Sequence, residues 1–413
     1  MKKTVLICIT FLFASHGFTQ DSVIQEPTYY PLILMDSPAR LFTMKQVNQN
    51  YISLYRFGSE KLHSHLKSDK IADLIEITLA GLLYMPLTHE EGHRSILTAK
   101  NIGSISQPYI NSKGAAYVVG VTDSTLKNLR DTDLPTYIRL HTAGLESDYM
   151  LTKRVEQIAA FEMDEKLHYK WEYLVRKFSI MQYFAFGLFK LDINLDEESN
   201  ELERDIVGHD IYGAAKHLHR PVENFYRYTD YSDLTIEEKK FVKRTAYRSF
   251  FNLANPLILG MNNFKLNDNL KINANMGYAL APFGDFIDQT FLLKFKNKLN
   301  ISFYLREYQN KENWFISSGI GIYNFEISPA FLTDVEVHFW HQPEQLDFNT
   351  AKSKPGGAID FTLKYKTTRS TTSNLQAFSF DAGFTFKTAG FLPEEMYLEK
   401  HLGFQIGASV WLF

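Results

Sequence analysis

The last third of the chain alternates, residue by residue, between an apolar and a polar or small side chain. The alternation begins at Leu270–Leu280 (LKINANMGYAL) and is clearest in Phe378–Phe386 (FSFDAGFTF), where one face is almost wholly aromatic. Successive side chains of a strand point to opposite faces, so the pattern predicts β-strands with one apolar face. Eight strands are expected, near residues 270–280, 289–297, 299–308, 313–323, 332–340, 357–367, 376–388 and 402–412.

These strands suit an antiparallel barrel in a membrane. Several reach the roughly 9–11 residues that a tilted strand needs to cross a bilayer, and their number is even. A soluble sandwich or lipid-binding barrel would alternate in the same way and stays an alternative. The terminal Trp411-Leu412-Phe413 resembles the C-terminal signal of bacterial outer-membrane barrels, although Gly407 and Ser409 stand where that signal prefers apolar residues. The resemblance implies an outer-membrane barrel over 270–413, and eight strands would enclose only their own side chains, so it would anchor rather than conduct.

The N-terminus predicts export. Met1-Lys2-Lys3, the apolar run 4–14 and the polar run 15–20 have the three regions of a secretory signal peptide. The only cysteine, Cys8, lies inside the apolar run behind bulky Leu6 and Ile7, so it reads as part of that peptide and not as a lipid anchor. Cleavage near Gln20 leaves a mature chain without cysteine, and any metal must then be held by histidine and carboxylate.

An apolar run precedes the most informative motif of the first half. Lys70–Tyr84 is too short to span a bilayer and carries Asp73 and Glu76, which predicts a buried core helix. Pro86 suits the first turn of a following helix. That helix contains His89-Glu90-Glu91-Gly92-His93, the pattern H-E-x-x-H. Residues four apart share a helix face, so His89 and His93 can bind one zinc ion while Glu90 acts as the general base of a hydrolase.

A second helix, opened by Pro135, contains His141, Glu146 and Asp148. With it the chain resembles the gluzincin-like zinc metallopeptidases, in which one helix supplies H-E-x-x-H and a later helix supplies a glutamate as third ligand. The resemblance implies metal ligands His89, His93 and Glu146, with Glu90 as catalytic base; His141 is the rival third ligand. Small residues Ala143 and Gly144 would let the two helices approach closely. The acidic residue that often follows the ligand glutamate by four positions is Met150 here, and Asp148 lies on another face of the helix than Glu146.

Two further segments bear on the site. Residues 114–121 suit a strand that either lines a substrate cleft, where an extended peptide could pair with it, or is purely structural. His209, Tyr212, His217 and His219 lie in a polar helical stretch, where histidine and tyrosine could steady an oxyanion but more often form plain surface.

The expected fold class is therefore α+β. A signal peptide (1–20) precedes a mostly helical zincin-like domain (21–251), a linker (252–269) and an all-β antiparallel barrel (270–413). A net charge of −3, with both signs mixed along the chain, excludes a nucleic-acid-binding surface.

The expected function is a zinc metallopeptidase of the bacterial envelope. Its substrate would be a peptide or protein, its membrane partner outer-membrane lipid, and its helical domain periplasmic; a soluble β-domain would instead make it secreted or periplasmic. One alternative is a zinc hydrolase of a non-peptide bond. Another is a barrel protein whose helical domain is a non-catalytic scaffold.

Overall fold

A computed structural model describes residues 28–38, 42–107, 116–164, 167–192, 197–296, 298–368 and 375–412. The predicted signal peptide with Cys8, and the terminal Phe413, lie outside these residues.

Ten antiparallel strands form one large sheet. Its order is β1-β12-β11-β10-β9-β8-β7-β6-β5-β4, so that after β1 each strand pairs with its neighbour in sequence. The strands are β1 (Thr28–Ser37), β4 (Phe264–Asn267), β5 (Leu270–Ala281), β6 (Gly284–Phe295), β7 (Leu299–Gln309), β8 (Trp314–Ser328), β9 (Phe331–Pro343), β10 (Ser353–Thr368), β11 (Leu375–Lys387) and β12 (His401–Leu412). A separate hairpin joins β2 (Ile105–Gln107) to β3 (Tyr117–Val119).

All eight predicted strands are confirmed, as β5 to β12, but the prediction of a closed eight-stranded barrel is wrong. The N-terminal strand β1 pairs with β12, with Tyr29 opposite Trp411. The other edge strand is the short β4, which pairs with β5 and lies within the segment predicted to be a linker. Among the described residues no pairing joins β1 to β4, so the sheet is barrel-like and open. Neither added strand has the long alternation by which the other eight are recognised.

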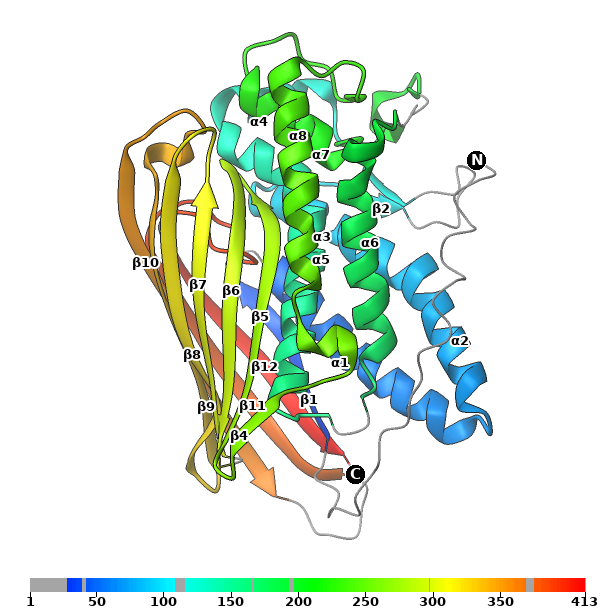
Figure 1. Ribbon diagram of the computed structural model, residues 1–413, viewed down its shortest axis with the longest axis vertical. Coiled ribbons are helices and arrows are strands. Elements are labelled where there is room, and N and C mark those ends of the chain that lie inside the picture. The colour runs from blue at the N-terminus through cyan, green and yellow to red at the C-terminus, as the bar shows by residue number, and fades with distance from the viewer. Residues whose placement is uncertain are drawn as a thin grey trace.

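The helices lie along one side of the curved sheet (Figure 1). They are α1 (Met44–His65), α2 (Asp69–Leu79), a π-helical turn (Ala80–Tyr84), α3 (Met85–Ala99), α4 (Asp123–Thr132), α5 (Leu134–Ala160), α6 (Lys170–Phe189), α7 (Asp210–His219) and α8 (Ile236–Arg248). Helix α5 is the longest of them, and its cap residue Asp133 accepts a hydrogen bond from Thr136 N.

Helix α5 packs directly against the inner face of the sheet. Tyr149 Oη donates to Asp288 on β6 at 2.6 Å, and Lys153 Nζ donates to Asn275 and Thr290 at 2.8 and 2.9 Å. Further along, Gln157 Nε2 donates to Tyr323 Oη. The helical region and the sheet thus form one packed unit and not two domains joined by a linker.

The two faces of the sheet have opposite polarity. Inward-facing positions hold buried polar side chains such as Lys364, Ser379, Asp381 and Ser409. Outward-facing positions of the same strands are exposed and apolar, among them Phe303, Phe339, Phe361, Tyr365, Phe380, Phe384, Leu402, Phe404 and Ile406. Gly407 and Ser409, the two departures from the terminal signal, lie on the inward face of β12, where apolar residues are not required.

The prediction of a buried core helix at 70–84 is wrong. In this segment Ala72, Glu76 and Ala80 are buried, whereas Ile71, Leu74 and Leu82 are 54%, 58% and 67% exposed. Within the described residues, Asp69–Ala99 is also the one helical segment long and apolar enough to cross a membrane.

The packing of α5 on the sheet yields the first prediction. Gly277 on β5 lies under Tyr149, and a Cβ there would overlap the Tyr149 ring. Gly277→Ala should therefore destabilise the protein by about 1–3 kcal/mol, through overpacking of a close contact. The measurement is the midpoint of thermal unfolding of the purified protein.

The control is Gly58→Ala on α1, where a Cβ meets nothing within 4 Å. This substitution should stabilise by about 0.5–1 kcal/mol, because alanine loses less backbone entropy in a helix. Equal shifts of the two midpoints would contradict the assigned contact.

Candidate metal centre

Three side chains from two helices converge on one point. His89 and His93 lie on the same face of α3, and Asp210 is the first residue of α7. Asp210 Oδ2 is 3.2 Å from His89 Nε2 and 3.5 Å from His93 Nε2. All three residues are buried, and their ligand atoms lie within 4.8 Å of one another.

The other nitrogen of each ring has a partner that fixes its orientation. His93 Nδ1 lies 2.6 Å from the carbonyl oxygen of Leu140, which can only accept, so Nδ1 donates. His89 Nδ1 lies 2.7 Å from Asp148 Oδ2, and Arg176 in turn donates to Asp148. A neutral imidazole that donates through Nδ1 presents the lone pair of Nε2, the form that binds a metal.

This arrangement places three electron pairs against one another. Two Nε2 lone pairs face one carboxylate oxygen, and Asp210 Oδ2 has no other hydrogen-bond donor among the described residues. Protons on the two Nε2 atoms could also bridge the rings to the carboxylate. The two imidazolium rings would then lie in one buried site with their centroids 5.0 Å apart. Without a metal ion the site favours protonated rings: although burial opposes it, Asp148 and Asp210 raise the pKa of His89, Asp210 raises that of His93, and the two histidines hold the pKa of Asp210 well below its usual range. The carboxylate thus requires positive charge beside it, which a bound metal ion would supply in place of the protons. The donor set of two imidazoles and one carboxylate fits a divalent metal such as zinc.

Glycines bring helix α5 against the two histidines. A Cβ at Gly144 would overlap Nε2 of both His89 and His93, and a Cβ at Gly92 would overlap the backbone of Ala143. The close approach of the two helices at Ala143 and Gly144 is therefore as predicted. Asp148 follows Gly144 by four positions, so it lies on the same face of α5 and reaches His89.

Glu146, the predicted third ligand, is not part of this cluster, and Asp210 lies beside the two histidines instead. Residues of a helix turn by about 100° each, so Glu146 lies about 200° from Gly144, away from the histidines. Its carboxylate pairs with Arg139, at 2.6 Å from Nη2 and 3.0 Å from Nε, and accepts from the backbone N of Glu394 at 2.8 Å. Glu146 thus neutralises a fully buried guanidinium and ties α5 to the loop before β12.

His141, the rival ligand, also lies outside the cluster. Its ring packs beside Tyr137 and His217, with centroids 5.1 and 5.5 Å away. Neither ring nitrogen has a hydrogen-bond partner among the described residues. Burial lowers the pKa of His141 to about 3, so the ring is neutral.

The interpretation of 209–219 as a polar surface is also wrong, because α7 is buried along most of its length. His209 stacks on Tyr212 with centroids 3.7 Å apart, and burial lowers the pKa of His209 to about 4. One feature of the sequence does point to Asp210: it precedes Gly213, Ala214 and Ala215, and such small residues favour close helix packing.

Glu90 lies beside the cluster on α3. It is half-buried, and the charges of both histidines, Asp205 and Asp210 act on its carboxyl group. The hairpin β2–β3 lies next to it, since Ser106 Oγ donates to Glu91 at 2.7 Å. On its far side β3 contacts the segment 202–206, through Ile206 N to Val118 O. Among the described residues no strand pairs with the other edge of β2.

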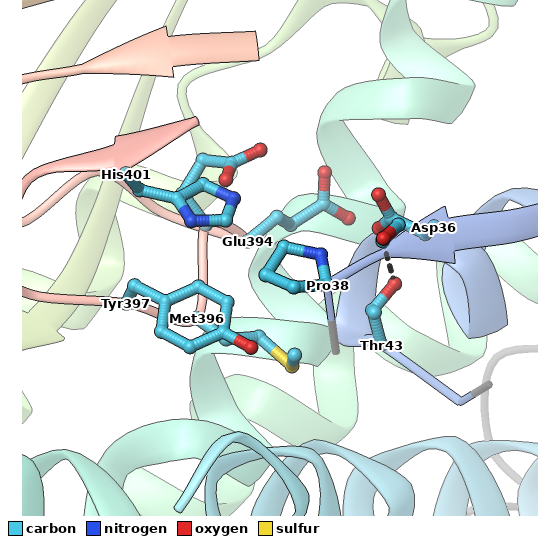
Figure 2. A pocket seen from close by; sticks show the side chains of 9 residues that line it. Asp36, Pro38, Thr43, Glu394, Met396, Tyr397 and His401 are labelled. Atoms are coloured by element: carbon cyan, nitrogen blue, oxygen red, sulfur yellow. Dashed lines mark hydrogen bonds between the residues drawn. The ribbon is translucent and has the colours of Figure 1, made fainter. Parts of the chain in front are cut away.

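Two cavities lie apart from the histidine–aspartate cluster. One of about 10 Å³, between the end of β1, the start of α1 and the loop before β12, is lined by Asp36, Thr43, Glu394 and Tyr397 (Figure 2). It has room for about one water molecule. The other, of about 150 Å³, lies between α5 and the inner face of the sheet and carries both charges, as in Lys153, Arg306 and Glu336. This second cavity is the polar interior of the sheet.

Comparison with known proteins assigns no family. No protein-family model and no curated protein matches the chain. Among solved structures it is similar to the crystal structure of Acinetobacter baumannii OccAB3, with a TM-score of 0.26 and 9% identity over 36% of this chain. The match spans 46% of that protein, less than half of its length.

The second prediction separates Glu146 from the cluster. Glu146→Gln leaves the buried Arg139 without its counter-charge and should destabilise the protein by about 3 kcal/mol. Thermal unfolding of the purified protein gives the measurement. As control, Glu237→Gln breaks the exposed Lys240–Glu237 pair on α8 and should cost less than about 1 kcal/mol. A Glu146→Gln protein as stable as the control would show that the Arg139 pair is not structural.

Proposed function

We propose that this protein is a membrane-anchored, zinc-dependent hydrolase that cleaves peptide bonds in the bacterial envelope. The proposal rests on the convergence of His89 Nε2, His93 Nε2 and Asp210 Oδ2. The Nδ1 atom of each ring already has another partner, Asp148 for His89 and the Leu140 carbonyl for His93. Three protein ligands leave a fourth position for water or substrate, as catalytic zinc sites do.

The residues of the chain divide the work of hydrolysis between them. When bound, zinc would lower the pKa of a water molecule and polarise the carbonyl that is attacked. His89, His93 and Asp210 would hold the ion, and Asp148 and the Leu140 carbonyl orient the rings. Glu90 accepts the proton of the water as its oxygen bonds to the carbonyl carbon. It then delivers that proton to the leaving nitrogen as the C–N bond breaks.

The hairpin next to the motif favours a peptide over other substrates. The edge of β2 that faces away from β3 offers backbone groups to which an extended chain can add as a further strand. Ser106 of this strand contacts Glu91, the neighbour of the proposed base, so a peptide bound there runs beside the cluster.

The polarity of the sheet supports the membrane anchor. Its exposed face is apolar and aromatic over most strands, and its buried face is polar, the reverse of a water-soluble protein. Bilayer lipid is the solvent that suits this outer face. We therefore propose an outer-membrane location, in which the protein requires detergent for extraction.

A second candidate function is a scaffold in which the same cluster is a structural link. Its support is burial: His93 and Asp210 are each 1% exposed, and neither cavity described above reaches them. In that case a metal would hold α3 to α7 without catalysis.

The third prediction concerns the ligands. Asp210→Asn should weaken zinc binding by more than about tenfold, because it removes the only charged ligand while preserving size. Glu146→Gln, in contrast, should retain zinc. Metal content of the purified proteins, with a chelator competition, measures both. Zinc kept by Asp210→Asn and lost by Glu146→Gln would restore the gluzincin-like ligand set.

The fourth prediction concerns the base. Glu90→Gln should retain zinc and the fold but lower hydrolysis of an unfolded protein such as casein by about 10²–10⁴-fold, since a carboxamide cannot accept the proton. The assay compares rates at equal zinc content. No measurable hydrolysis by the zinc-loaded unaltered protein would favour the scaffold.

A further inference from the structure

The open sheet has one edge at β1 and another at β5 with the short β4, and residues outside the sheet bond to the backbone of β1 and of β5. Along β1, the carboxamide of Asn50 on α1 accepts from Ile33 N and donates to Ile33 O, at 2.7 and 2.8 Å. Ser53 Oγ donates to Pro31 O, and Gln46 Nε2 donates to Leu34 O. One polar face of α1 therefore takes the place of a neighbouring strand.

The edge at β5 is satisfied in the same way where the short β4 ends. Asn252 accepts from Tyr278 N and donates to Tyr278 O, both at 3.0 Å. Met276 N donates to Ala254 O. Unpaired backbone groups are not tolerated in a hydrocarbon medium, so capped edges are what an open sheet needs there.

Helix α2 and the turns that follow it expose an apolar face on the side of the molecule where the sheet is open. The helix packs on α1 and α6 and lies on the side of the bundle away from β5–β8 (Figure 1). Exposed side chains between positions 71 and 88 are Ile71, Leu74, Thr78, Leu82 and Leu87. The one hydroxyl among them bonds back to its own helix, Thr78 Oγ1 to Leu74 O at 2.7 Å. A helix from Ile71 to Leu87 rises about 25 Å, close to the height of the apolar band of outer-membrane barrels.

The charged groups of this segment turn inward. Asp73 accepts from Trp171 Nε1 of α6, and the buried Glu76 accepts from Ser59 and Tyr55 of α1. A core helix would be buried on most sides, yet 28% of the apolar stretch within Asp69–Ala99 is buried. The segment thus keeps an apolar outer face: Glu76 is buried in the bundle, and Asp73, with 35% of its side chain exposed, is bonded to α6 beside that face.

Neighbouring helices extend the same surface. On α1, Leu54 and Phe57 are 61% and 39% exposed. On α6, Phe178 and Phe189 are 40% and 71% exposed, and the stretch between them has no charged residue. We define the helical wall as the outer faces of α1, of α2 with the following turns, and of α6.

We propose that bilayer lipid covers this helical wall, so that helices α1, α2 and α6 complete the circumference that the ten strands leave open. The occupant follows from continuity. Helix α1 contacts β1 at one edge, α6 contacts the turn Ser249–Leu253 that caps β5 at the other, and α2 packs on both helices. The outer face of the sheet is itself apolar. This inference rests on the proposed membrane location. It adds that a helical bundle, and not a strand pairing, closes the barrel, and that the histidine–aspartate cluster lies behind a lipid-facing helix.

Single cysteines in a Cys8→Ser background test the proposal. Nitroxide labels are placed on the wall at Leu74 and Leu82, on the sheet at Phe380 and Phe404, and at the exposed Glu237 of α8 as a water-facing control. The protein is reconstituted in vesicles of phosphatidylethanolamine and phosphatidylglycerol. Relaxation by oxygen, which concentrates in lipid, is compared with relaxation by a water-soluble nickel chelate.

Labels at both wall positions should match the sheet positions, with an oxygen-to-nickel ratio several-fold above that at Glu237. Lipid contact at Phe380 and Phe404 with nickel access at Leu74 and Leu82 would overturn the helical wall alone. Nickel access at all four positions would overturn the membrane location as well.

Discussion

The contact between helix α5 and the inner face of the sheet is the interaction on which the rest of the structure depends. One side of α5 bonds to strands through Tyr149, Lys153 and Gln157. Another side presents Gly144 and Asp148 to the histidines of α3. The same helix therefore fills the sheet and positions the proposed ligands. A displacement of α5 would disturb both, because its glycine contacts leave no space for adjustment.

The inward polar residues of the sheet are satisfied in two ways. On β5 and β6 they bond to α5, as Asn275 and Thr290 do to Lys153; on the later strands they pair with one another, Lys364 with Asp334 and Ser409 with Asp381. The aromatic positions are then left on the outside, where water is an unfavourable solvent for them. Our proposals of a membrane anchor and of a lipid-covered helical wall both derive from this distribution, and the capped edges of β1 and β5 make it compatible with an open sheet.

The candidate site combines residues that are close in the sequence with one that is far from them in the chain. His89, Glu90 and His93 lie within one helical turn, so their shared face follows from helix geometry alone. The carboxylate of the cluster, Asp210, does not come from the helix that the gluzincin resemblance implies. Glu146 and Asp148 are two residues apart, yet the first pairs with Arg139 and the second orients His89. Which of them faces the cluster depends on how α5 is rotated against α3, and Gly92 and Gly144 determine that rotation.

The sequence by itself determined the elements that depend on near neighbours: eight strands from their two-residue period, the motif helix from its spacing and the apolar segment before it. Only the tertiary structure decided that β1 joins β12, that the sheet stays open, that the apolar segment lies at the surface and that Asp210 meets the histidines. These outcomes pair residues far apart in the chain. Their energies depend on packing and on the desolvation of buried charges, such as Arg139 with Glu146, and no local pattern carries that information.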